Sequence, residues 1–160
     1  MMTAGQRHLL VDGYNVLHQW PRGKAFLRRG QLAAARDYLA AEVRVLHDRE
    51  GLRVTLVFDG KGEKVELERP YEDLTFSFLY APSGLSADAV IEQLVSGAGD
   101  PSQCLVITQD SLERETLQVA GATVMGPDDL AAWVRQAEGR LAGELQKRKQ
   151  ESHEWWRHIK

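Results

Sequence analysis

Short apolar runs alternate with longer stretches of helical periodicity along this chain, and no other feature constrains its fold so strongly. Apolar runs alternating with helices are typical of a parallel sheet covered by helices on both faces. We therefore predict an α/β fold, a three-layer sandwich with a mainly parallel sheet. The apolar runs are HLLVD (8–12), RVTLVFDG (53–60), LTFSFLYAP (74–82), QCLVITQD (103–110) and ATVMG (122–126).

Helices are predicted between these runs and after the last of them. Ser86 is placed to cap one helix, and Gly121 ends the next. Residues 61–73 have mixed charge and no clear period, so we expect a loop or a small hairpin there. The predicted helices cover residues 31–49, 86–99 and 111–121, and a long C-terminal stretch that begins at Pro127.

The composition is that of one ordinary domain. The chain has 160 residues, of which 43% are hydrophobic and 27% charged, which is enough for one sizeable core. We expect a domain over residues 1–136 and a charged helical extension over 137–160. No signal peptide and no membrane span is recognisable, so a cytoplasmic protein is expected. The single cysteine, Cys104, lies in an apolar run and is predicted to be buried.

The extension ends in EWWRHIK, and Trp155 and Trp156 allow two interpretations. They pack against the helix or a second subunit, which makes a homodimer one expectation, or they stack on RNA bases.

Three of the four longest apolar runs end in an aspartate, namely Asp12, Asp59 and Asp110. Asp88 and Glu92 lie four residues apart, on one face of a predicted helix that begins near the same edge. Because the carboxyl ends of parallel strands meet at one rim of the sheet, we expect these acids to converge.

Each acid also has a structural explanation. Asp110 fits an N-cap, with Glu113 completing a capping box, and Asp88 is favoured by the helix dipole. Asp12 and Asp59 each precede a glycine and fit a turn. Converging carboxylates, however, repel one another unless a cation neutralises them, and Mg²⁺ or Mn²⁺ suits oxygen ligands. Such an ion promotes attack of water on phosphorus, which is nuclease chemistry.

Two further groups of residues fit this chemistry. Asn15 follows the first aspartate closely and either orients a carboxylate or the attacking water, or shapes a turn. A net charge of −3 argues against coating nucleic acid by bulk charge, although local patches can still bind phosphates. The candidate RNA-binding patch after the first run consists of Arg22, Lys24, Arg28 and Arg29.

The segments LLVDGYNVL, VTLVFDG, SADAVIEQLV and LVITQDSLERE occur in the order and spacing of a known family. Over residues 7–134 the chain resembles the YacP-like branch of the NYN domains, which belong to the PIN-like nuclease superfamily. The resemblance implies a three-layer α/β fold and a metal-dependent RNA endonuclease. Ser86 stands where the family commonly has threonine. The implied functional positions are Asp12 and Asn15 in the first motif, Asp59 in the second, Asp88 in the third and Asp110 in the fourth.

We therefore expect an endoribonuclease whose metal is held by carboxylates. Asp12, Asp88, Asp110 and Asn15 are the expected catalytic residues. The three aspartates are the expected metal ligands, together with Asp59 and Glu92. The alternative is a catalytically silent module of the same fold that binds RNA or a ribonucleoprotein.

Two other enzyme classes fit less well. A phosphatase-like site with Asp12 as nucleophile favours a second aspartate where Tyr14 stands. A nucleotide-cofactor enzyme needs a glycine-rich phosphate loop, which this sequence lacks.

Overall fold

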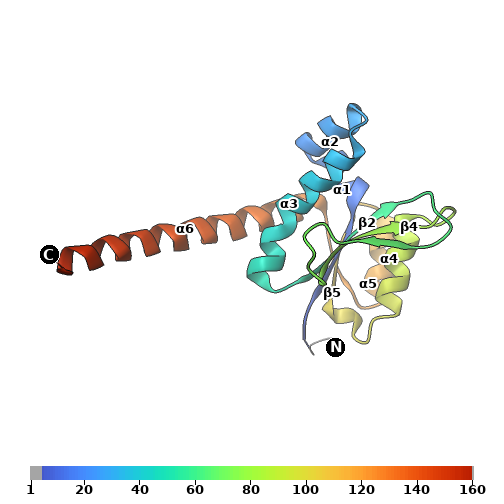
Figure 1. The fold of residues 1–160 in the computed structure, drawn as a ribbon. Helices are drawn as coiled ribbons and strands as arrows, with labels where there is room; N and C mark the ends of the chain where they lie inside the picture. The colour runs from blue at the N-terminus through green and yellow to red at the C-terminus, as the bar shows by residue number, and fades with distance from the viewer. Residues whose placement is uncertain (1–4, 160) are drawn as a thin grey trace.

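The computed structural model describes the backbone of residues 5–159 and the side chains of residues 5–152. One six-stranded sheet, of order β3-β4-β2-β1-β5-β6, forms its centre (Figure 1). Neighbouring strands are parallel except for β3 and β4, so the prediction of a mainly parallel sheet is confirmed. The strands are β1 (His8–Asp12), β2 (Arg53–Asp59), β3 (Glu66–Glu68), β4 (Phe76–Ala81), β5 (Cys104–Ile107) and β6 (Thr123–Met125).

Helices connect and cover the strands. The sequence pattern did not predict the two short helices that follow β1, because neither spans enough turns to show a period. Pro21 starts the second of them at the first helical position, where its missing N–H is not needed. The helices are α1 (Gly13–Gln19), α2 (Pro21–Arg28), α3 (Leu32–Glu50), α4 (Ala87–Ser96), α5 (Ser111–Val119) and α6 (Pro127–Ile159), with a 3₁₀ turn at Pro101–Gln103.

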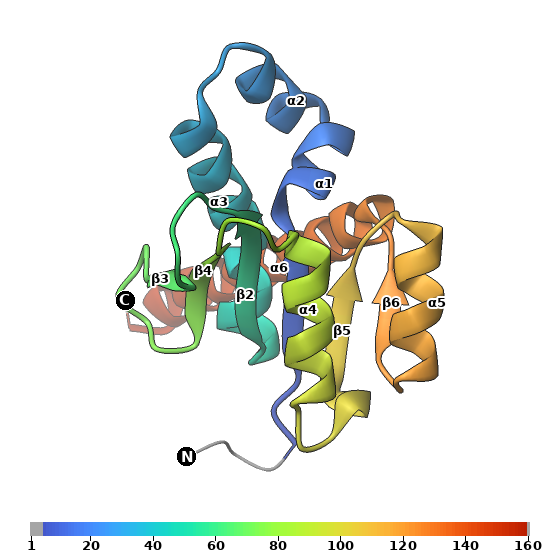
Figure 2. The same cartoon turned by 90° about the vertical axis from the view of Figure 1, so that its right-hand side faces the viewer.

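The molecule has three layers, as Figure 2 shows, with α4 and α5 on one face of the sheet and α3 and α6 on the other. Strand β1 illustrates how the sequence produces these layers. Leu9 and Val11 pack in the core beneath α1, α3 and α6, whereas Leu10 packs beneath α4 and α5. Both faces are buried, which explains why the strands read as continuous apolar runs.

The segment between β2 and β4 forms a small hairpin excursion, as predicted, because β3 pairs antiparallel with β4. Cys104 is buried at the start of β5, also as predicted, and is a free thiol.

Helix α6 leaves the body of the molecule and extends far beyond it (Figure 1). Ala137 is its last residue in the hydrophobic core. Two ion pairs then join it to the end of α3, Arg140 with Glu50 and Glu144 with Arg49. The tryptophan pair of the C-terminal tail, at positions 155 and 156, lies outside the described side chains. Within the described residues, no helix is apolar enough over sufficient length to cross a membrane.

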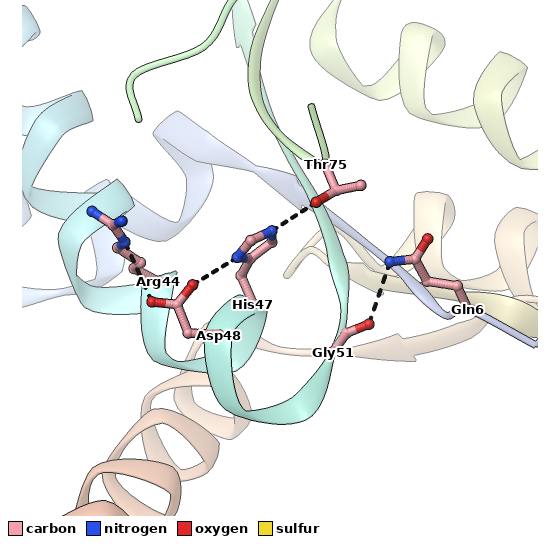
Figure 3. A network of polar contacts seen from close by, with 6 residues as sticks. All are labelled: Gln6, Arg44, His47, Asp48, Gly51 and Thr75. Atoms are coloured by element: carbon pink, nitrogen blue, oxygen red, sulfur yellow. Dashed lines mark hydrogen bonds and ion pairs between the residues drawn. The ribbon is translucent and has the colours of Figure 1, made fainter. Parts of the chain in front are cut away.

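A polar network fixes the edge of the sheet where the strands begin (Figure 3). The ring of His47, near the end of α3, lies 2.8 Å from Asp48 through Nδ1 and 2.8 Å from the Thr75 hydroxyl through Nε2. Arg44 pairs with Asp48 at 3.4 Å. The network joins α3 to the chain entering β4, at the opposite edge from the carboxyl ends of the strands.

Candidate active site

The path of the chain marks one point on the sheet as the expected ligand site. From β1 the chain proceeds outward to β2 and β4, and then returns to the other side of β1 for β5 and β6. Ligands of parallel α/β sheets bind outside the carboxyl ends of the strands, where the direction of winding reverses. Here that point lies between β1 and β5. Asp12 is the last residue of β1, and Asp110 follows β5.

Asp12 and Asp88 form a carboxyl pair at this point. Asp88 lies in the first turn of α4, which begins at the same rim. Burial, followed by hydrogen bonding with Asp88 and by the charge of Asp88, raises the pKa of Asp12 to about 8, although the backbone N–H of Asn15 acts in the opposite direction. Asp88 Oδ1 is buried without a hydrogen-bond partner in the structure.

Glu92 and Glu113 form a second carboxyl pair. Glu113 is only 8% exposed, and its Oε1 is buried without a hydrogen-bond partner. Burial, followed by hydrogen bonding with Glu92 and by the charges of Glu92, Asp88 and Asp110, raises the pKa of Glu113 to about 8. The two pairs are therefore parts of one electrostatic unit. We call it the acidic cluster, comprising Asp12, Asp59, Asp88, Glu92, Asp110 and Glu113.

Glu113 was not among the predicted site residues, because the capping-box pattern explained it. The structure corrects that interpretation. The N–H of Asp110, which a capping box would assign to Glu113, is donated instead to Thr108 Oγ1 at 3.2 Å. One signal in the sequence could have revealed this placement, since Glu113 lies in the first turn of a helix that begins at the rim, as Asp88 does.

Asp110 does cap α5, as its structural explanation predicted. Its Oδ1 accepts hydrogen bonds from the N–H groups of Leu112 and Glu113, at 3.0 and 3.2 Å. These bonds use one carboxylate oxygen, so the cap does not occupy Oδ2. Capping and ligand binding are thus compatible for this residue.

Asn15 and Asp59 hold neighbouring elements in place. Asn15 Oδ1 accepts the N–H of Gln109 at 3.1 Å, which ties α1 to the loop that carries Asp110. Asp59 is exposed, and its Oδ1 accepts the N–H of Ala87 at 3.0 Å, beside the predicted cap at Ser86. Asp59 thereby fixes the start of the helix that carries Asp88.

Gly13 allows α1 to begin directly after the first aspartate. A Cβ atom at this position would lie 2.2 Å from the ring of Phe58, so only glycine permits this approach. The turn after β1 is therefore a tight strand-to-helix junction that holds Asp12 at the rim.

The four predicted RNA-binding cations belong to α2 or follow it, and α1 and α2 project beyond the rim (Figure 2). Lys24, Arg28 and Arg29 are exposed. Arg22 is exposed as well, but its guanidinium lies 5.1 Å from the ring centroid of Tyr38. It lines a cleft of about 560 Å³ between α2, α3 and α6, which includes no member of the acidic cluster.

The donor atoms of the acidic cluster suit a hard divalent cation. All are carboxylate oxygens, and two of them are buried without a partner. Among the described residues, no three or more His, Cys, Asp or Glu side chains lie close enough together to hold an ion between them. Asp12 pairs with Asp88, and Glu92 pairs with Glu113. These residues fit a divalent cation because their donors are carboxylate oxygens and because two of those oxygens have no hydrogen-bond partner.

A six-stranded, mainly parallel α/β sheet with carboxylates at its switch point agrees with the PIN-like nuclease fold that the sequence resemblance implied. The chain belongs to the YacP-like NYN domain family, whose model matches residues 9–159. The match extends beyond the resemblance detected in the sequence, since it includes most of the C-terminal extension.

Individual relatives agree with this assignment. The uncharacterized protein YacP of Bacillus subtilis (strain 168) is 29% identical over 140 residues, covering 87% of this chain and 81% of that protein. The crystal structure of Rae1 (YacP) from Bacillus subtilis matches with a TM-score of 0.71 and 27% identity, over 91% of this chain and 83% of that chain. A crystal structure of a single-residue variant of Rae1 gives a TM-score of 0.75 and 26% identity, over 91% and 86%.

Proposed function

We propose that this chain is an endoribonuclease that depends on Mg²⁺ or Mn²⁺. Asp12, Asp88 and Asp110 hold the cation, with Asp59 and Glu92 beside them. When bound, the cation acts as a Lewis acid that favours attack of water on phosphorus and neutralises charge on the phosphoryl oxygens. The convergence of Asp12 and Asp88 at the switch point is the observation that supports this proposal most strongly.

Glu113 extends the proposed ligand set. It contacts Glu92 and has a buried, unpaired oxygen, so it resembles Asp88 in both respects. Without a cation, protons hold each acid pair together. A divalent ion competes with those protons, because carboxylates bind metal in their ionised form. The raised pKa values of Asp12 and Glu113 are what such a site shows when it is filled by protons.

Asn15 acts as a positioning residue in this proposal. Its bond to the N–H of Gln109 fixes the loop that carries Asp110 relative to Asp12. The exposed cations Lys24, Arg28 and Arg29 project from the active rim and hold RNA phosphates. Arg22 is the weakest member of that predicted set, since its guanidinium lies over Tyr38.

One observation favours the alternative, a silent RNA-binding module of the same fold. The described acids stand in pairs and not in a closed group of three. In a silent module the raised pKa values would persist in the presence of divalent ions, whereas in a nuclease the ions would lower them.

The test is incubation of the purified chain with a mixed RNA pool, with Mn²⁺ or with EDTA, followed by mapping of the product ends. A nuclease produces defined new ends only with Mn²⁺, and Asp12→Asn abolishes them. Glu115→Gln is the matched control, because Glu115 is an exposed acid on α5 outside the acidic cluster. Loss of cleavage in the control as well would show that the assay reports general damage.

We also propose that residues 1–136 form the nuclease unit and residues 137–160 an appended helix. The burial of α6 supports this division, since its core contacts end at Ala137. Removal of residues 152–160 is expected to leave cleavage of a short RNA unchanged. A loss of that activity would place the tail within the nuclease unit.

A further inference from the structure

A groove lies beside the acidic cluster, on the side of the rim formed by β2 and β4. Its volume is about 580 Å³, within the range of small-ligand sites. Helices α1, α2 and α3 and the ends of the two strands contribute its walls. Asp59 lines it, so the groove begins at the acidic cluster. We call it the aromatic groove, defined by Tyr14, Arg36, Asp59, Lys61 and Tyr80.

Arg36 is held in this groove by two tyrosines. Its Nη1 donates to the hydroxyl of Tyr14 at 3.2 Å, and its guanidinium carbon lies 5.5 Å from the ring centroid of Tyr80. Among the described residues, no ion pair involves Arg36 or Lys61. The groove therefore presents two cations without a carboxylate partner, one of them fixed in orientation before any ligand binds.

The walls of the groove carry aromatic and apolar surface. Tyr80 donates its hydroxyl to Glu68 at 2.8 Å, and burial, followed by that bond, raises its pKa to about 12, so it stays neutral. Leu32, which also lines the groove, is 47% exposed. Aromatic faces beside a stacked guanidinium form a platform on which unpaired bases stack, whereas bases within a duplex are not accessible in this way.

From this placement we propose that the aromatic groove binds single-stranded RNA next to the scissile phosphate. Arg36 and Lys61 hold backbone phosphates, and a base stacks against the surface formed by Tyr80 and Arg36. This inference rests on the proposed function, since it assigns the strand path that leads to the acidic cluster. Charge complementarity supports the choice of ligand, because a polyanion supplies the partners that the two cations lack.

The experiment measures binding without cleavage. Fluorescence anisotropy of a short fluorescein-labelled oligouridylate is recorded in EDTA, at several salt concentrations, for the full chain and its variants. Lys61→Ala and Arg36→Ala are expected to weaken binding several-fold. Each should also reduce the slope of log affinity against log salt by about 0.7, the value for one phosphate contact in a single strand.

Tyr80→Leu tests the stacking contribution separately. It is expected to weaken binding by about tenfold, with a smaller change in the salt slope than Arg36→Ala gives, since base stacking does not release counterions and Tyr14 still holds Arg36. Arg7→Ala is the matched control, because Arg7 is an exposed cation preceding β1, at the opposite edge of the sheet. Circular dichroism of each variant verifies that it is folded, and Lys61 lies in an exposed loop where truncation does not disturb the core.

The outcomes separate this inference from the proposed function. Weaker binding in the Lys61 and Arg36 variants, with Arg7→Ala unchanged, supports the groove even if no RNA is cleaved. Unchanged affinity and slope in both groove variants would overturn the groove assignment, even if the wild-type chain cleaves RNA with Mn²⁺. Equal weakening of a hairpin duplex would overturn the assignment to single strands.

Discussion

Asp12 at the end of β1 and Asp88 in the first turn of α4 bring two carboxyl groups together at the switch point of the sheet. Because the two carboxyl groups are close together and partly buried, ionising both would destabilise the fold unless a proton or a cation neutralises the charge. In the metal-free chain a proton neutralises the pair, and in the proposed nuclease a divalent ion takes the place of that proton.

The stability of the metal-free chain is expected to fall as pH rises from about 4 to about 8. The pKa of Asp12 in the folded chain is about 8, above its ordinary value of 3.8. The folded chain therefore retains a proton that the unfolded chain releases, so stability present at low pH is lost across this window. Asp12→Asn removes this titration. In EDTA, thermal melts should show the variant several degrees more stable than wild type at pH 8 and nearly equal at pH 4. A variant less stable at pH 8 would show that the aspartate is not in a repulsive pair.

Glu113→Gln is expected to reduce the stabilisation that Mn²⁺ gives. A ligand that binds only the folded state raises the melting temperature by an amount that grows with the logarithm of its affinity, and the substitution weakens that affinity by removing one anionic donor. The Mn²⁺-induced shift should be smaller in Glu113→Gln and unchanged in Glu115→Gln. Equal shifts in all three proteins would place Glu113 outside the metal site.

The exposed cations of α2 are expected to contribute to RNA affinity through phosphates alone. The double substitution Lys24→Ala with Arg28→Ala should lower the salt slope by about 1.4 for a single strand, at about 0.7 per contact. Arg22→Ala should change the slope less, since Arg22 lies over Tyr38 and borders a different cleft. An unchanged slope in the double variant would identify these residues as an ordinary solvated face.

Thr75→Val is expected to lower stability without affecting cleavage. The substitution leaves Nε2 of His47 without its partner, which costs about 1–3 kcal/mol, or a few degrees in melting temperature. The network in Figure 3 lies at the far edge of the sheet from the acidic cluster, so the cleavage rate should not change. Thr116→Val, at an exposed position on α5, provides the control for stability. A large loss of cleavage in a folded Thr75→Val chain would contradict the separation of the two edges.

The strands and the long helices could be predicted from the sequence because each has a strong local signal. The centre of a strand such as β1 is a continuous apolar run, and α3 repeats its apolar residues over five turns. The short helices α1 and α2 lacked that length, and they depend on tertiary contacts such as the approach of Gly13 to Phe58.

The sequence predicts those site residues that lie at or just after the ends of strands. Asp12 and Asp110 were placed at the rim by the parallel topology alone. Glu113 was missed because its spacing from Asp110 matches a local capping pattern, and only the packing of α5 against α4 turns its side chain toward Glu92. The aromatic groove was missed for a similar reason, since Tyr14, Arg36 and Tyr80 come from three separate elements.

The most direct test of the metal-site account is cleavage of single-stranded RNA by EDTA-stripped protein as Mn²⁺ is added back. We predict that wild-type activity returns with Mn²⁺, that Asp12→Asn stays at background at every Mn²⁺ concentration, and that Glu115→Gln follows the wild type. Cleavage by the stripped wild type without added metal, or by Asp12→Asn at the wild-type rate, would contradict the account.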